Sequence, residues 1–256
     1  MQTTTPRIIT RRLRIGDIPA LIDLEHKQWK PEQAAGAEAF RQRITTYPAL
    51  SNGAFNARTG ELLASLFCKP TSEAEWVQPG DWKTSARLDG DGHARVRNAS
   101  PHALFGISLT SIEPRAALQL IAFQYLMAVR SGQRYAYLGS PMPGLARHLS
   151  RQPGASVDEY ARATRAGLPL DPQLRYYHAK GFRELVAVRE NYFPHAASHD
   201  YGAILRSKVP LQWLRPVLML LPPATLRALA ALAPRWAIPR ESSAQAYPSP
   251  SPAARA

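Results

Sequence analysis

Cysteine is almost absent from this sequence. The 256 residues contain one cysteine, Cys68, which excludes a disulfide framework within the chain and is typical of a reducing compartment. Cys68 ends the apolar run 61–68 (ELLASLFC), so we expect a buried strand residue rather than a nucleophile. His, Asp and Glu are not grouped at the spacings of metal ligands, and no metal site is predicted.

Long hydrophobic runs are absent as well. Residues 1–12 (MQTTTPRIITRR) lack the apolar segment of a signal peptide. The longest apolar run towards the C-terminus falls far below the roughly 20 residues that a membrane-spanning helix needs. We therefore expect a cytoplasmic protein, either free or peripheral at the inner face of a membrane. The hydrophobic content of 45% is sufficient for the core of one large domain.

Acidic residues are scarce relative to basic ones. The 32 Lys and Arg residues outnumber the 19 Asp and Glu residues, which gives a net charge of +13. This excess suggests an anionic partner, such as nucleotide phosphates, an acidic carrier protein, anionic lipid or nucleic acid. An arginine-rich composition that places Arg on solvated faces would give the same excess. No basic run is interleaved with aromatic residues and no nucleic-acid motif is present, so nucleic acid is not predicted as a partner.

Strand and helix patterns alternate along residues 7–207, which we predict to be one domain. Asp17 can cap a helix whose apolar stripe continues to Glu25 and which is followed by Trp29. Asp171 can cap another helix, and Gly181 follows its last residues. Further helices are predicted over 37–46 and 115–130, and strands over 7–15, 54–57, 61–68, 104–112, 134–139, 182–192 and 201–205.

Two insertions interrupt this pattern. The first, 69–102, reads as a long ordered loop with one or two short strands. Its two tryptophans, Trp76 and Trp82, either cover a pocket or pin the loop to the domain. The second insertion, 141–170, contains Ser156, which can cap a small helix.

The C-terminal part differs from the rest in composition. Residues 208–240 are predicted to form a basic, apolar helical extension, and no acidic residue occurs between Gly202 and Arg240. Short apolar helices that carry arginine and tryptophan suit an anionic membrane surface or an anionic partner. The alternative is a pair of helices packed on the domain's own surface. Residues 241–256 (ESSAQAYPSPSPAARA) are predicted to be a disordered tail.

One stretch resembles a known family. Residues 174–182 (LRYYHAKGF) resemble the penultimate helix and the start of the next strand in the GNAT superfamily of N-acetyltransferases. The order of the preceding elements is similar to that family too. The resemblance implies an α/β (α+β) fold with a mixed, mostly antiparallel central sheet flanked by helices, here with a C-terminal helical extension.

The resemblance also implies an acyl donor, acetyl-CoA or another acyl-CoA, at the junction of strand 104–112 and the next helix. The family's phosphate-binding turn reads Gln or Arg, two residues, Gly, one residue, and Gly or Ala. Arg115 stands at its first position here, but Leu118 and Leu120 replace the glycines, so the pyrophosphate loop is degenerate. Three alternatives follow for the acyl donor: Arg115 and the helix N-terminus suffice to bind its pyrophosphate, the donor binds in a different way, or it does not bind at all. The residues assigned to the donor are Leu109, Thr110, Ser111, Arg115, Ala116, Ala117, Leu118 and Gln119.

The resemblance implies direct acyl transfer from a thioester to an amine or similar acceptor. Tyr177, four residues before Gly181, would be the general acid, and Tyr176 beside it competes for that role or binds substrate. Glu25 and Trp29 would line the acceptor site. The candidate bases are Glu25, Glu113 and His178, and a water chain would also serve. The alternatives are a helix-end salt bridge for Glu25, a core anchor for Trp29 and a core aromatic for Tyr177.

Two other functions remain open. The missing glycines suggest a catalytically impaired GNAT-like binding module. The order of a Pro-Gly turn at 143–144, a Glu-Tyr helix at 159–160 and Asp171-Pro172 resembles a subgroup found beside acyl-chain or polyketide enzymes. This weaker resemblance implies a carrier-protein-linked acyl-handling protein. The predicted partners are therefore acyl-CoA and a small-molecule or carrier-protein-linked acceptor.

Overall fold

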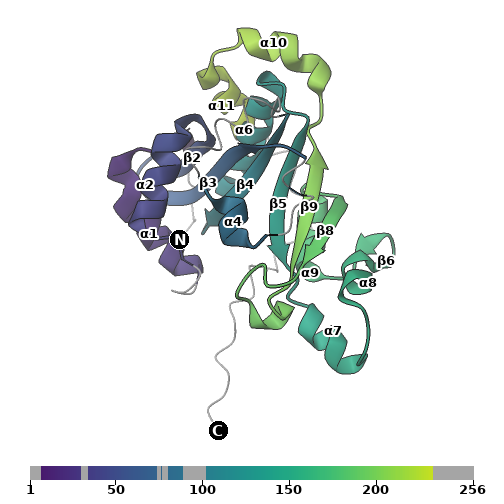
Figure 1. The fold of residues 1–256 in the computed structure, drawn as a ribbon. Helices are drawn as coiled ribbons and strands as arrows, with labels where there is room; N and C mark the ends of the chain where they lie inside the picture. The colour runs from purple at the N-terminus through teal and green to yellow at the C-terminus, as the bar shows by residue number, and fades with distance from the viewer. Residues whose placement is uncertain (1–6, 30–33, 74–75, 77–79, 89–101, 233–256) are drawn as a thin grey trace, which may run out of the picture.

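The protein is built around one seven-stranded sheet. A computed structural model describes residues 7–29, 34–73, 76, 80–88 and 102–232 (Figure 1). The strand order is β1-β2-β3-β4-β5-β9-β8. Only β4 and β5 are parallel neighbours, which confirms the predicted mixed, mostly antiparallel sheet. The strands are β1 Ile8–Arg12, β2 Ser51–Asn56, β3 Leu62–Thr71, β4 Ala103–Ser111, β5 Tyr135–Pro141, β8 Glu184–Arg189 and β9 Gly202–Lys208.

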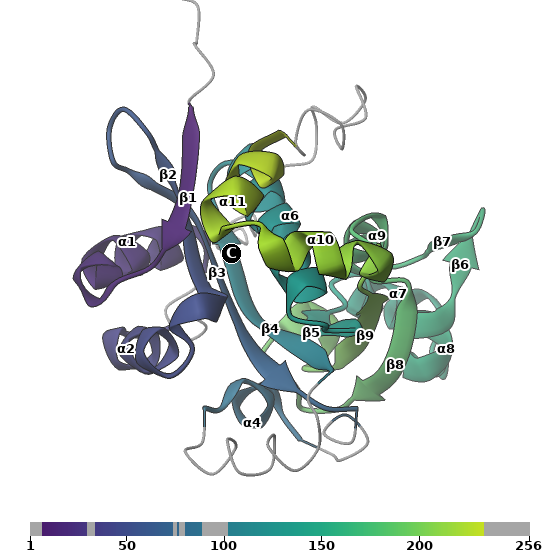
Figure 2. The same cartoon turned by 90° about the horizontal axis from the view of Figure 1, so that it is seen from above.

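Helices cover both faces of this sheet. Figure 2 shows α1, α2 and α4 on one side, and α6, α10 and α11 on the other. A small hairpin of β6 (Thr164–Arg165) and β7 (Leu168–Pro169) stands apart from the main sheet. The helices are α1 Ile18–Gln28, α2 Ala37–Thr46, α4 Trp82–Ala86, α6 Pro114–Arg130, α7 Leu145–Arg151, α8 Val157–Arg162, α9 Pro172–Ala179, α10 Arg215–Leu220 and α11 Pro223–Leu232, with short 3-10 turns at η1 Ile15–Asp17, η2 Pro48–Leu50, η3 Ala196–Ser198 and η4 Gln212–Leu214.

Each face of the sheet has its own apolar core. On the first face, Leu21 of α1 and Phe40 of α2 pack against Phe105 of β4. On the second face, Phe123 of α6 and Leu226 of α11 are the buried centre. Burial of this kind contributes about 2 kcal/mol for each large apolar side chain, so the two layers hold the sheet between them.

The first insertion is more regular than the predicted loop. Strand β3 continues to Thr71 because Lys69–Thr71 pair with the start of β4, and α4 forms where Asp81 accepts a hydrogen bond from the Thr84 amide. Trp76 is buried and stacks on Phe105 with ring centroids 4.6 Å apart, so it pins this segment to the core. Residues 74–75, 77–79 and 89–101 of the insertion lie outside the described residues. Cys68 is buried as predicted, and burial raises the pKa of its thiol to about 12.

The predicted cap Asp171 ties the second insertion to α9. Its carboxylate accepts hydrogen bonds from the amides of Gln173 (2.8 Å) and Leu174 (3.1 Å) at the start of α9. It also accepts from the Gly144 amide and the Tyr160 hydroxyl, both at 2.9 Å. One buried carboxylate therefore holds α7, α8 and α9 in one arrangement.

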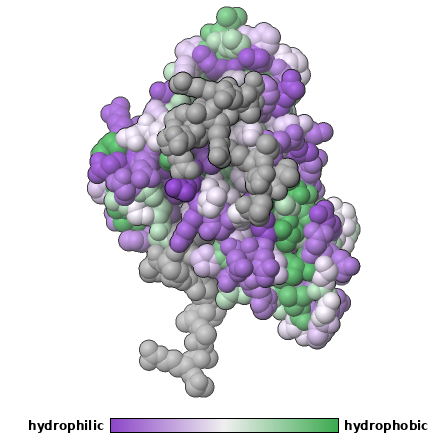
Figure 3. Space-filling view, in the orientation of Figure 1, coloured by the Kyte–Doolittle hydropathy of each residue, from purple (hydrophilic) through white to green (hydrophobic). Residues whose placement is uncertain are grey.

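The C-terminal extension packs on α6 and also presents apolar side chains to solvent. Leu218 is buried, and the Arg130 guanidinium donates to the carbonyls of Leu218 and Leu221. Trp213 and Leu220 are 75% and 86% exposed, and Figure 3 shows hydrophobic surface at the top of the molecule, where α10 lies in Figure 1. Within the described residues, no helix is both long and apolar enough to cross a membrane. Contact with an anionic membrane surface stays a prediction; residues 233–256, with the predicted tail, lie outside the described part.

We expect Asp171→Ala to lower the free energy of unfolding by about 3 kcal/mol, because it removes a helix cap and leaves buried donors unpaired. Asp158→Ala is the matched control, since Asp158 is exposed and its ion pair with Arg162 is worth about 0.5 kcal/mol. Urea denaturation of both variants measures the difference. An equal loss of unfolding free energy in the two variants would show that Asp171 contributes no more to stability than an exposed carboxylate does.

Candidate active site

Strand β4 separates from β5 halfway along its length. Residues 103–106 of β4 pair in parallel with residues 135–138 of β5, and the register between the two strands ends there. On its other side, β4 continues to pair with β3 as far as Ser111. The second half of β4 therefore has a paired edge towards β3 and an edge towards β5 along which the ladder has stopped.

A β-bulge lies where the two strands separate. Phe67 of β3 is opposite Ser108, but the next residue, Cys68, is opposite Gly106, so Ile107 is the extra residue of β4. Ile107 packs into the core beneath α1 and α2, and Ser108 bonds to a residue of α2. The bulge thus shifts the alternation of side chains between the two faces by one residue. As a result, Ser108 and Thr110 of the second half of β4 face α1 and α2.

The backbone of this half-strand has a defined orientation. The Ile112 amide donates to the Leu63 carbonyl of β3 at 3.0 Å. Because amides alternate along a strand, those of Leu109 and Ser111 point away from β3, towards the side where pairing with β5 has ended. The Thr110 amide points towards β3. Of the three β4 residues assigned to the donor, Leu109 and Ser111 therefore have amides aimed at the free edge.

Thr110 joins two predicted site residues through its side chain. Its hydroxyl donates to Glu25 Oε2 at 2.7 Å and accepts from Trp29 Nε1 at 3.0 Å. The Ala35 amide donates to Glu25 Oε1 at 3.4 Å. Glu25 and Thr110 are 4% and 1% exposed. Burial raises the pKa of the Glu25 carboxyl, although the hydrogen bonds from Thr110 and Ala35 oppose the shift.

Arg43 is a site residue that the sequence analysis missed. It is 6% exposed, and its Nη1 donates to Ser108 Oγ at 3.2 Å. Its guanidinium lies over the rings of Phe40 and Phe67, at 5.6 and 5.4 Å from their centroids. Burial lowers the pKa of Arg43 to about 10, and the charge of Glu25 partly offsets this. The signal was its position three residues after Phe40, which puts it on the apolar face of α2.

Tyr177 lies on the opposite face of the sheet from Glu25. It packs on the apolar cluster that also receives Leu138, the last residue of β5 that pairs with β4. Its ring meets the rings of Tyr176 and Phe182 edge-on, with centroids 5.3 and 6.2 Å apart. Tyr176 is 39% exposed, and Lys180 Nζ lies 5.3 Å from its ring centroid. The structure therefore brings Glu25 and Trp29 together and places Tyr176 and Tyr177 elsewhere.

The N-terminus of α6 is capped by the side chain of Glu113, the residue that precedes the helix. Glu113 accepts a hydrogen bond from the Arg115 amide through its carboxylate at 3.1 Å. The amides of Ala116 and Ala117 donate to the Glu113 carbonyl, at 3.0 and 3.2 Å. Pro114 has no amide hydrogen. A carboxylate thus occupies the helix end where a phosphate would be expected to bind.

The remaining predicted donor residues on α6 take part in the fold. Ala116, Ala117 and Gln119 are buried, and Leu118 is half-buried. Gln119 Nε2 donates to Thr10 Oγ1 of β1 at 2.9 Å. Their assignment to the donor stays a prediction. Among the described residues, no group of His, Cys, Asp and Glu could hold a metal ion.

We expect the stability of the wild type, relative to Glu25→Gln, to fall as the pH rises. A carboxyl whose pKa is higher in the folded state than in the unfolded state binds its proton more tightly when folded. Its contribution to stability is full below about pH 4, the unfolded value, and is lost as the pH rises through the raised pKa. The expected relative loss is about 1 kcal/mol or more, measured by urea denaturation between pH 4 and pH 8. Glu38→Gln, an exposed site on α2, is the charge control, and a difference that stays constant with pH would contradict the assignment.

Comparison with known proteins identifies the fold. No family model matches the sequence, and no curated protein does. The loading GNATL domain of CurA from Lyngbya majuscula is similar at a TM-score of 0.64 and 15% identity, over 79% of this chain and 98% of that one. The GphF GNAT-like decarboxylase in complex with isobutyryl-CoA is similar at 0.61 and 20%, over 79% and 99%. A malonyl-CoA decarboxylase from Rhodopseudomonas palustris gives 0.51 and 14%, over 83% of this chain and 58% of that one. The chain has the GNAT fold that its sequence predicted.

Proposed function

We propose that this protein is an acyltransferase that moves an acyl group from an acyl thioester to an amine by direct attack. The observation that carries the proposal is the edge of β4 beyond its pairing with β5, where the Leu109 amide points outward beside the Glu25–Thr110 pair. A thioester at this edge would have its carbonyl within reach of a fixed donor.

The residues around this edge can supply the required proton transfers. The acceptor nitrogen attacks the thioester carbonyl, the C–N bond forms, and the C–S bond breaks. Glu25, whose pKa burial raises, takes the proton from the amine, and the Thr110 hydroxyl holds its carboxylate in place. Tyr177 approaches from the other face of the sheet and protonates the departing thiolate. The Leu109 amide stabilises the charge that develops on the carbonyl oxygen.

The N-terminus of α6 restricts which acyl donor can bind. The Glu113 carboxylate occupies that helix end, so the diphosphate of CoA would meet a negative charge there. Arg115 is the residue that could offset this charge. A carrier-protein thioester, whose pantetheine arm carries one phosphate and no adenosine diphosphate, suits this helix end at least as well. Acyl-CoA and carrier-linked thioesters are therefore both proposed donors.

The mechanism predicts that Tyr177→Phe lowers thiol release from acetyl-CoA, with a panel of primary amines as acceptors, by about a hundredfold, because the thiolate loses its proton donor. Tyr176→Phe is the matched control, since it removes a hydroxyl from the adjacent residue. Calorimetric titration with acetyl-CoA separates donor binding from chemistry. Loss of activity in the Tyr176 variant alone would assign the acid role to Tyr176, and wild-type rates in both would refute a tyrosine acid.

A second candidate is decarboxylation of a malonyl-type thioester. The names of two similar structures, GphF GNAT-like decarboxylase and malonyl-CoA decarboxylase, suggest it, and the buried Arg43 cation beside β4 offers a site for the carboxylate. In this reaction the bond between the α-carbon and the carboxylate breaks, and the electron pair passes to the thioester oxygen. The Leu109 amide would stabilise the resulting enolate, which then takes a proton at carbon from water.

Malonyl-CoA labelled at its free carboxylate separates the two candidates. Acyl transfer releases CoA thiol in proportion to added amine and leaves the label in the acyl product. Decarboxylation releases labelled CO₂ without added amine and forms acetyl-CoA. Thr110→Val should lower acyl transfer by about tenfold or more, because it frees the Glu25 carboxylate from its partner. Release of CO₂ in the absence of any acceptor would replace the transferase proposal.

A further inference from the structure

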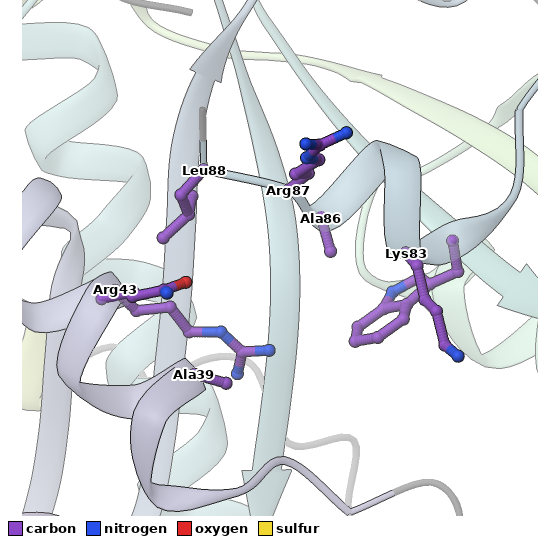
Figure 4. Close-up of a pocket in the computed structure, with 8 residues that line it drawn as sticks. Ala39, Arg43, Lys83, Ala86, Arg87 and Leu88 are labelled. Atoms are coloured by element: carbon purple, nitrogen blue, oxygen red, sulfur yellow. The ribbon is translucent and has the colours of Figure 1, made fainter. Parts of the chain in front are cut away.

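A cavity of about 400 Å³ lies between α2 and α4, on the same face of the sheet as Glu25 and Thr110. The first insertion forms one wall, because α4 belongs to it. The other wall is the side of α2 that carries Arg43. The residues that line it are Ala39, Gln42, Arg43, Trp82, Lys83, Ala86, Arg87 and Leu88 (Figure 4).

The charge of the cavity lining has one sign. Arg43, Lys83 and Arg87 contribute three cations, and no Asp or Glu is among the lining residues. Lys83 and Arg87 are exposed, whereas Arg43 is buried. A cavity with this lining attracts anions, and its buried member does so in a region of lower dielectric than water.

The Arg43 guanidinium has unused hydrogen-bonding capacity. Arginine carries five N–H donors, and within the described part of the chain Arg43 makes one hydrogen bond, to Ser108 Oγ. Glu25 influences it only through a longer-range charge interaction, because no carboxylate among the described residues lies within ion-pair distance of it. Figure 4 shows the Arg43 side chain extending from α2 into the space between α2 and α4. Buried charges in proteins are normally paired, so this cation is suited to a partner that enters from the cavity.

We propose that this cavity binds the anionic group of the acceptor, a carboxylate or a phosphate. This inference rests on the proposed acyl transfer and names its substrate class, an amine that also carries an anion. A carboxylate or phosphate can bind the planar guanidinium through two parallel hydrogen bonds. Lys83 and Arg87 at the rim add charge and raise the rate of encounter.

The position of Arg43 connects the cavity to the chemistry. It contacts Ser108, which lies two residues before Thr110 on the same face of β4. An acceptor whose anion is held at Arg43 would therefore present its amine towards Thr110 and Glu25. The donor arm is predicted at the N-terminus of α6 on the other face, so donor and acceptor would approach the free edge of β4 from opposite sides.

The test is calorimetric titration of the full chain with three amines. The probes 4-aminobutyrate and 2-aminoethyl phosphate carry an amine with a carboxylate or a phosphate, and butylamine has the amine alone. We expect one or both anionic probes to bind at least about tenfold more tightly than butylamine, because each can pair with the buried cation. The anionic probe that binds more tightly indicates whether the acceptor's anion is a carboxylate or a phosphate.

Variants locate the binding. Lys83→Gln, at an exposed position, should lower the affinity for the anionic probe about threefold, and Arg43→Met should lower that affinity by about tenfold or more. Arg41→Gln is the matched control, because Arg41 is exposed on α2, pairs with Glu38 and does not line the cavity. Its affinity should equal that of the wild type. A thermal melt of the Arg43 variant checks folding, and the Lys83 variant remains informative if that variant unfolds.

The inference would be overturned by equal binding of butylamine and the anionic probes, by no binding of either anion, or by equal effects of Arg41→Gln and Lys83→Gln. A parallel titration with acetyl-CoA keeps this failure separate from that of the proposed function. Donor binding without anion binding would remove the cavity from the mechanism and leave acyl transfer in place. Anion binding without donor binding or thiol release would retain the anion site and remove the transferase.

Discussion

The half-paired strand β4 is the constraint on which the rest of the structure depends. A parallel ladder with β5 over residues 103–106 and an antiparallel ladder with β3 over its whole length cannot both continue once the bulge at Ile107 turns the strand. Beyond the bulge, β4 continues to pair with β3 and no longer pairs with β5. The β4 residues of the candidate site take their positions from this choice, because Thr110 and Ser108 face α1 and α2 and Leu109 has its amide at the free edge. Tyr177 packs near the end of the ladder on the other face.

The polar side chains around β4 form two hydrogen-bonded groups, one between α1 and β4 and one between α2 and β4. Trp29 donates to Thr110, Thr110 donates to Glu25, and Arg43 donates to Ser108. Each is buried or half-buried, so each bond forms in a medium where an unmade bond costs more than at the surface. The two ionisable members are shifted towards neutrality by the same burial, Glu25 upwards and Arg43 downwards. A buried carboxyl and a buried guanidinium held apart on one face provide a base and an anion site without cancelling one another.

The elements of the fold could largely be predicted from the sequence, because they depend on local periodicity. The helix expected at 37–46 forms with the same bounds, and Asp171 caps α9 as its position before Pro172 indicated. The bulge could not be predicted, since residues 104–112 read as one continuous strand and the extra residue is defined only by the register of β3. Glu25 and Trp29 were reached through a resemblance, whereas Arg43 was missed because a charged residue on an apolar helix face reads as solvated. Glu113 was considered only as a base, although an acidic residue before Pro114 is also a helix cap.

The bonds made by Asp171 have a mechanical consequence. The helix that carries Tyr177 begins at the same carboxylate that holds Gly144 and Tyr160, so α9 cannot shift independently of the segment between β5 and α9. That segment projects from the body of the sheet in Figure 1. A macromolecule bound to α8 or to the β6–β7 hairpin would displace α9 through the hydrogen bonds of Asp171. Binding at the insertion, far from β4, would therefore change the position of the Tyr177 side chain relative to the sheet.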